Sequence, residues 1–362
     1  MRKITLLTLV LFLITSCSQE TQVDKRNESK SLNREDIIND EYFVLNDAEK
    51  VDIYNLKNDE IIYSYKEENN ELVYDVIEGL ESINISSWEY ASKLNKSNEI
   101  DDSNVLYTQT EAPIDANFQV YSKKDKSVEK YRISEIFPEV VNYVNVYCYG
   151  NSSSKFIVCA EGEKLYIYNK ELKQTSKLLD ESTSDLYIEK VMIHLDKIVI
   201  LGREAKTNAK LQMRILNDIG EVLDSSILKA ENINELLETD TFVYINDSYN
   251  PLKKTSSGVI EGYDFSTNTF FSKKLKTSNT FESSFTRISQ DGKYAISMEK
   301  IEEKDEKEKV AIRIYDFETM DVIDESEKEC ENGIGYISIG LDYYFYIEEN
   351  ESSITAELKE LR

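Results

Sequence analysis

One residue in the chain has the chemistry of a general base near neutral pH, its single histidine, His194. A nucleophilic triad would need such a base. His194 lies in residues 191–195, where branched and aliphatic side chains favour a β-strand. Its side chain would alternate with those of Ile193 and Leu195, which favours a strand face over a catalytic role. Because Gly-x-Ser-x-Gly, His-Glu-x-x-His and phosphate-binding glycine motifs are also absent from the sequence, we predict no catalytic residue.

Carboxylates offer a second kind of chemistry, because glycoside hydrolysis needs only two acids at a set separation. The chain holds 69 Asp and Glu residues, so close pairs must arise by chance and the sequence singles out none. Residues 101–104 and 246–250 are rich in oxygen ligands for Ca²⁺, but neither matches the EF-hand pattern. We interpret both as solvated turns and predict no cofactor or metal site, with Ca²⁺ as the alternative.

The four cysteines are Cys17, Cys148, Cys159 and Cys330, and no Cys-x-x-Cys pair supports zinc or thioredoxin chemistry. Cys148 and Cys159 flank a predicted hairpin over residues 149–155 and would face one another across it. An exported protein permits a disulfide there. Two small buried thiols are the alternative, and Cys330 stays unpaired in either case.

The elements that would position these residues are short strands in a repeating unit, clearest in residues 284–326. Asp291-Gly292 supplies the positive φ of a tight turn between the first two strands, and Asp316 begins a turn between the last two. The alternating charges of residues 302–309 predict a solvated hairpin tip, with an electrostatic docking tab as the alternative. Four strands are predicted, over residues 285–289, 294–298, 310–315 and 320–323.

A strand ending in Tyr and a small polar residue recurs along the chain at intervals of about 50 residues. The copies are Tyr54-Asn55, Tyr121-Ser122, Tyr168-Asn169, Leu216-Asn217, Tyr263-Asp264 and Tyr315-Asp316. One anchor per four-stranded sheet predicts an all-β fold, a single β-propeller over residues 41–362. We expect about seven blades, with six or eight as alternatives, and a strand near residues 35–44 that completes the final blade.

The first interval between anchors is longer than the rest by about 20 residues, and the excess falls near residues 83–104. This segment contains the only tryptophan, Trp88, and residues 86–89 match a helix capping box. A local helix or extended loop there would form a binding lip. The alternative is that Trp88 packs between blades.

The formal net charge of −26 limits the partners. Such a surface repels phosphate backbones and anionic lipid, so we predict no nucleic-acid binding. Solubility is the simplest role of the charge, and attraction of a basic partner is the alternative.

The N-terminus resembles that of bacterial lipoproteins. Arg2 and Lys3 precede an apolar run too short for a convincing membrane span, and Ile14-Thr15-Ser16-Cys17 matches the lipobox. The resemblance implies a signal peptide over residues 1–16 and a diacylglycerol with palmitate-type chains on Cys17. Residues 17–40 read as a lipidated, disordered tether. We therefore expect a protein, predicted to be a monomer, that is anchored to the outer face of the cell membrane. The chain is rich in Lys, Asn, Ile and Glu, as AT-rich genomes encode, and this favours a Gram-positive bacterium.

Residues 289–296, Ser-Gln-Asp-Gly-Lys-Tyr-Ala-Ile, together with Ile314-Tyr315-Asp316, resemble the WD40-like repeats of TolB-like propellers. Gln290 stands where that family has proline. The resemblance implies a scaffold whose loops bind a protein or a carbohydrate, and it implies no catalytic residue.

These observations together predict a lipid-anchored envelope propeller that binds or assembles with an envelope protein or glycan. An acid-dependent glycosidase or lyase is one alternative. A sensor or accessory lipoprotein of a transporter or signalling system is the other.

Overall fold

The computed structural model describes most of the chain between residues 42 and 360. The described segments are 42–47, 50–55, 60–66, 71–91, 96–101, 104–107, 112–180, 182, 184–204, 210–230, 233–247, 258–275, 284–304, 307–330, 334–339, 343–350 and 353–360.

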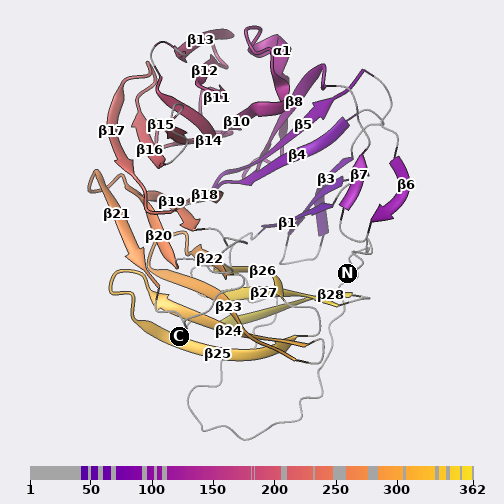
Figure 1. The fold of residues 1–362 in the computed structure, drawn as a ribbon, viewed down its shortest axis with the longest axis vertical. Helices are drawn as coiled ribbons and strands as arrows, with labels where there is room; N and C mark the ends of the chain where they lie inside the picture. The colour runs from indigo at the N-terminus through magenta and orange to yellow at the C-terminus, as the bar shows by residue number, and fades with distance from the viewer. Residues whose placement is uncertain are drawn as a thin grey trace, which may run out of the picture.

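Within these segments the strands form seven antiparallel sheets of three or four strands and one two-stranded hairpin, and the seven larger sheets follow one another around a ring (Figure 1). Sheet 1 contains β1 (Tyr42–Asp47), β2 (Lys50–Asn55) and β3 (Glu60–Lys66). Sheet 2 contains β4 (Glu71–Glu78), β5 (Ser82–Glu89), β8 (Asp115–Ser122) and β9 (Val128–Arg132). Sheet 3 contains β10 (Val146–Gly150), β11 (Phe156–Glu161), β12 (Lys164–Asn169) and β13 (Gln174–Leu179).

Sheet 4 contains β14 (Leu186–His194), β15 (Lys197–Glu204), β16 (Leu211–Leu216) and β17 (Val222–Ile227). Sheet 5 contains β18 (Ile233–Glu238), β19 (Phe242–Asp247), β20 (Val259–Asp264) and β21 (Thr269–Lys274). Sheet 6 contains β22 (Ser284–Ile288), β23 (Tyr294–Lys304), β24 (Lys307–Asp316) and β25 (Val322–Cys330). Sheet 7 contains β26 (Ile334–Ile339), β27 (Tyr343–Asn350) and β28 (Ser353–Glu360).

The first strand of a sheet lies toward the centre of the ring and contacts the first strand of its neighbour. β10 packs on β14, β14 on β18, and β22 on β26 (Figure 1). The second strands are covered on both faces, so that Ile198, Val199, Ile200 and Leu201 of β15 are all buried. The predicted all-β propeller is confirmed.

The polar anchors close the turns between third and fourth strands, as predicted from the sequence. Asp264 Oδ1 accepts a hydrogen bond from the Ser266 N–H (2.8 Å), and Asp316 Oδ1 accepts one from the Thr319 N–H (2.8 Å). Asn217, next to the leucine of the imperfect copy, accepts from the Glu221 N–H (2.9 Å) in the same way. A short side chain that bonds the backbone a few residues on stabilises such turns.

The residue after two of these anchors joins one sheet to the preceding one. Phe265 of sheet 5 packs on His194 of sheet 4, with ring centroids 4.7 Å apart. Phe317 of sheet 6 stacks on Phe242 of sheet 5 at 5.3 Å. The repeated Tyr-Asp-Phe sequence therefore supplies both a turn and an inter-sheet contact.

Sheet 6 matches the predicted unit, but its second and third strands are longer than predicted. Gly292 has a φ of 74°, as expected for the turn that follows Asp291, and a Cβ there would meet the Phe242 ring at 2.7 Å. β23 ends at Lys304 and β24 begins at Lys307, so the charged residues do flank a hairpin tip.

The two end sheets have three strands each in the described part of the chain, and their three strands correspond to different positions of the four-stranded unit. The anchor Tyr54-Asn55 ends β2, whereas in sheets 2, 3, 5 and 6 the anchor ends the third strand. Sheet 1 thus corresponds to strands two to four, while β26 packs on β22 as a first strand. The prediction that residues 35–44 complete the final blade is wrong for the described residues 42–44, because they pair with β2.

Four further elements lie between the strands of the seven larger sheets. β6 (Lys96–Asp101) and β7 (Asn104–Tyr107) form a hairpin between β5 and β8, and α1 (Ile133–Ile136) and η2 (Tyr143–Asn145) connect β9 to β10. In the described segments no helix combines the length and apolar character needed to cross a bilayer.

Candidate functional site

The carboxylate of Glu238, at the end of β18, joins the inner strands of four sheets. Its Oε1 accepts hydrogen bonds from the Leu80 N–H (2.8 Å) and the Tyr149 hydroxyl (3.0 Å). Its Oε2 lies 2.8 Å from Nδ1 of His194. Leu80 follows β4, Tyr149 lies in β10 and His194 ends β14. Sheets 2 to 5 therefore meet at one side chain, which we call the Glu238 cluster.

Gly79 allows sheet 2 to approach this closely. A Cβ at residue 79 would collide with the Tyr149 hydroxyl and lie 2.7 Å from Glu238 Oε1. Burial, with Glu238 beside it, raises the pKa of Tyr149 well above its ordinary value, so its hydroxyl keeps its proton and donates.

The Glu238 cluster has the residue types of an acid–base site but not the access. The side chains of His194 and Glu238 are 3% and 4% exposed, and Phe265 covers the imidazole. Nε2 of His194 is buried with no hydrogen-bond partner in the described part of the chain. His194 lies on a strand, as predicted, although β14 ends at this residue and Leu195 falls in the following turn. Its contacts are those of a buried tie between sheets.

Metal chemistry finds no support among the residues that the structure describes, where no group of three or more His, Cys, Asp or Glu side chains could hold an ion. The side chains of residues 101–104 and 246–250, which we interpreted as solvated turns with Ca²⁺ binding as the alternative, lie outside the described set.

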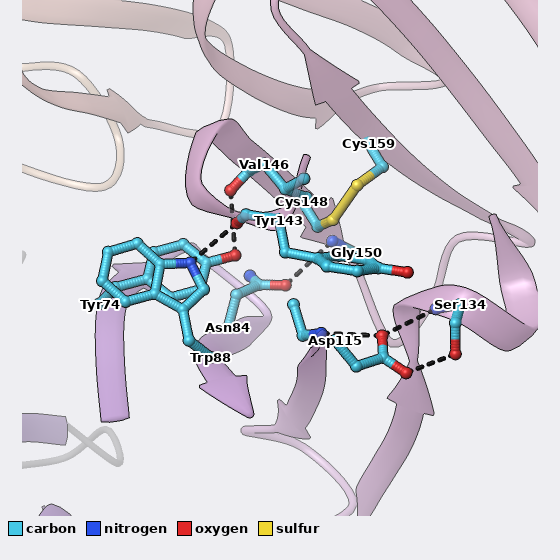
Figure 2. Close-up of a disulfide and its surroundings, with 11 residues drawn as sticks. Tyr74, Asn84, Trp88, Asp115, Ser134, Tyr143, Val146, Cys148, Gly150 and Cys159 are labelled. Atoms are coloured by element: carbon cyan, nitrogen blue, oxygen red, sulfur yellow. Dashed lines mark hydrogen bonds between the residues drawn. A yellow bond between two sulfur atoms is a disulfide. The ribbon is translucent and has the colours of Figure 1, made fainter. Parts of the chain in front are cut away.

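Trp88 lies on β5, so the predicted capping box and local helix are wrong (Figure 2). Residues 82–89 pair with β4 on one side and with β8 on the other, and this pairing outweighs a local capping pattern. The Trp88 ring stacks on Tyr74 at 4.5 Å, and its Nε1 donates to the Tyr143 carbonyl oxygen (2.8 Å). Trp88 thus packs between sheets 2 and 3, and the inserted residues form the β6–β7 hairpin.

Residues 141–145, which we call the Val141 loop, lie directly against Trp88. Buried Glu161 fixes the backbone of the loop, because its Oε1 accepts hydrogen bonds from the N–H groups of Val141 (3.1 Å) and Asn142 (2.7 Å). Val141 and Val144 nevertheless project outward, with Val141 75% exposed. The loop combines a fixed backbone with apolar side chains that face water.

Cys148 and Cys159 lie opposite each other on β10 and β11, with their Cα atoms 4.2 Å apart, and the structure joins them in a disulfide (Figure 2). Both are buried in the cluster that contains Phe137 and Val140, just before the Val141 loop. The Cys17 and Cys330 side chains lie outside the described set.

The predicted site residues are brought together only in part. Trp88 and the Cys148–Cys159 pair lie in the same region around β10, whereas His194 lies in the Glu238 cluster (Figure 2). Sequence reasoning missed Glu238, Tyr149 and the Val141 loop. No local signal marks Glu238, because its partners are far away in the sequence.

Comparisons with known proteins find similar solved structures but no family. No protein-family model and no curated protein matches the chain. Hsv2p of Kluyveromyces lactis is similar in structure, with a TM-score of 0.45 and 10% identity over 79% of this chain and 75% of that chain. The acylaminoacyl peptidase of Pyrococcus horikoshii has a TM-score of 0.44 and 12% identity, over 80% of this chain and 45% of that chain. The chain thus spans less than half of the peptidase.

Proposed function

We propose that the protein is a lipid-anchored β-propeller that binds or assembles with an envelope protein on the outer side of the cell membrane. The anchor rests on the lipobox sequence that ends at Cys17. Two acyl chains on one residue give a stable attachment, which a single chain does not.

The observation that carries the binding role is the Val141 loop. Exposed apolar side chains normally move with their loop, and ordering the loop on binding costs free energy. Here the hydrogen bonds to Glu161 and from Trp88 fix the backbone beforehand. A rigid scaffold that presents such a loop is the usual design of a binding site.

The chemistry of the loop favours a protein partner over a glycan. Sugar rings bind well on open aromatic faces, but one face of the Trp88 ring is stacked on Tyr74 and its Nε1 is bonded to the Tyr143 carbonyl oxygen. Val141 and Val144 offer aliphatic surface instead, and Ile114, which bonds to the backbone next to Trp88, is also exposed. Apolar contact at the centre of an interface is typical of protein partners.

Crosslinking with mass spectrometry on intact cells at native expression tests this role. We expect a reproducible protein partner linked through the sheet 2–sheet 3 region. Val141→Asp should abolish the crosslink, because the partner would have to desolvate a carboxylate. Leu172→Asp is the matched control, since Leu172 is also exposed on sheet 3 but lies in the turn after Asn169.

Equal crosslinking of the wild-type and Val141→Asp proteins would remove the Val141 loop from the binding role. The anchor is tested separately by Cys17→Ala, which should release the protein from the membrane fraction. Full retention of that variant in the membrane would overturn the lipid anchor and leave the loop hypothesis standing.

A further inference from the structure

The outer edge of sheet 4 exposes more large apolar side chains than the outer strand of any other described four-stranded sheet. Ile219, Val222, Leu223 and Ile227 are each between 49% and 65% exposed. They lie on β17 and on the turn that leads into it, residues 219–227, which we call the β17 edge. An exposed edge strand with apolar side chains is a template for pairing with another chain.

The other outer strands of four-stranded sheets carry the usual protection and β17 does not. Lysine on an edge strand disfavours the addition of a further strand. In the described four-stranded sheets, each outer strand other than β17 contains lysine, while β17 reads Val-Leu-Asp-Ser-Ser-Ile. The lysines of the other outer strands are Lys130, Lys177, Lys273, Lys274 and Lys328.

The backbone of the β17 edge presents hydrogen-bonding groups outward. The Leu228 N–H donates a hydrogen bond to the Leu211 carbonyl oxygen. Because the bonding direction of an antiparallel strand alternates, the backbone N–H and C=O groups of Ser226 and Asp224 also point toward β16. The N–H and C=O groups of Ser225 and Ile227 therefore point away from the sheet. The Ser225 N–H is bonded to Asp224 Oδ1 (2.8 Å), a contact that a fifth strand would have to displace.

We propose that the β17 edge binds an extended, basic segment of a partner protein as a fifth strand of sheet 4. Asp218, Glu221 and Asp224 give the edge a negative rim. A Lys or Arg on the incoming segment pairs with Asp224 and draws its carboxylate outward, which releases the Ser225 N–H for the new ladder. Alternate apolar residues of the segment cover Leu223 and Ile227. A second copy of the chain fits poorly, because it carries the same net charge of −26.

Titration of the full-length protein with a short peptide that alternates valine and lysine tests the proposal. Binding should slow hydrogen exchange at the Ser225 and Ile227 amides. Ile227→Lys and Ser225→Pro should each weaken binding about tenfold, through lost apolar contact and a lost outward N–H respectively. Neither change removes a hydrogen bond between β17 and β16.

Ser176→Lys on β13 is the matched control, because it adds the same charge to an exposed outer-strand position that already has a lysine beside it. The affinity of the Ser176→Lys protein for the valine–lysine peptide should stay within about twofold of wild type. A comparison peptide with its valines and lysines in separate blocks should bind weakly. Equal binding of both peptides, or an equal loss in Ser176→Lys, would reduce the effect to nonspecific charge and overturn the proposal. Protection of the two amides that grows with protein concentration alone would overturn it in favour of a second copy.

Discussion

At the scale of single residues, the side chain of Glu238 has the largest structural consequence. Taking a carboxylate out of water is costly, and the cost is recovered only when hydrogen bonds satisfy its oxygens. Leu80, Tyr149 and His194 provide three such contacts from three other sheets. The cluster therefore ties together segments that the chain order keeps apart.

Glu238→Ala should lower the free energy of unfolding by about 3 kcal/mol, because it leaves the Tyr149 hydroxyl, the Leu80 N–H and the His194 ring without their acceptor. Urea denaturation measures the change. Glu235→Ala on the same strand is the control. Glu235 pairs with Arg287 at 2.7 Å but is 48% exposed, so its loss should cost under about 1 kcal/mol. Equal losses in the two variants would contradict the role of the cluster.

The sequence predicts the setting of His194 but not its partners. Alternation with Ile193 and Leu195 is a local pattern, and it identifies a strand. Glu238 is separated from its partners by whole sheets, and a single sequence carries no trace of contacts at that distance.

At the scale of elements, the turns between third and fourth strands depend on ionised aspartates in two sheets. Desolvation acts to raise the pKa of Asp264, but hydrogen bonds from the Ser266 hydroxyl and from the Ser266 and Thr267 N–H groups outweigh it and lower the pKa. The pKa of Asp316 is lowered chiefly by the Thr319 N–H. A pKa lowered by folding stabilises the protein above the ordinary Asp pKa, and this contribution disappears as pH falls through the folded value.

Asp264→Asn should keep the turn, because Asn169 and Asn217 already occupy this position in sheets 3 and 4. We expect a loss below about 1 kcal/mol at pH 7, since water screens this exposed group. The difference from wild type should shrink as pH falls below about 4. Denaturant unfolding across pH measures this gap. Asn169→Asp should instead be slightly more stable than wild type at pH 7 and should lose this advantage as pH falls. A difference between Asp264→Asn and wild type that widens in acid would contradict the assignment.

Elements defined by local chemistry are predictable, and elements decided by pairing are less so. The anchors Asp264 and Asp316 bond within their own turns, so the sequence places them correctly. Residues 86–89 satisfy a helix capping pattern, yet strands on both sides hold them in β5. The two contacts that fix Trp88 come from Tyr74 and Tyr143, which no local pattern connects to it.

At the scale of the whole molecule, the net charge of −26 opposes the compact state through self-repulsion. Raising NaCl from about 0.01 M to about 0.15 M shortens the Debye length from about 30 Å to about 8 Å. The urea midpoint should therefore rise over this range. A midpoint that falls would mean that the surface ion pairs, which salt also screens, outweigh the repulsion.

The position of Glu238 in the chain also bears on the order in which the sheets can fold. Ribosomes release the N-terminal residues first, so sheets 2, 3 and 4 are complete in sequence before residue 238 has been made. Until then the Tyr149 hydroxyl and the Leu80 N–H lack the acceptor that the finished ring gives them. A nascent chain stalled before residue 238 should therefore be more open to proteases than one stalled just after sheet 5 has emerged.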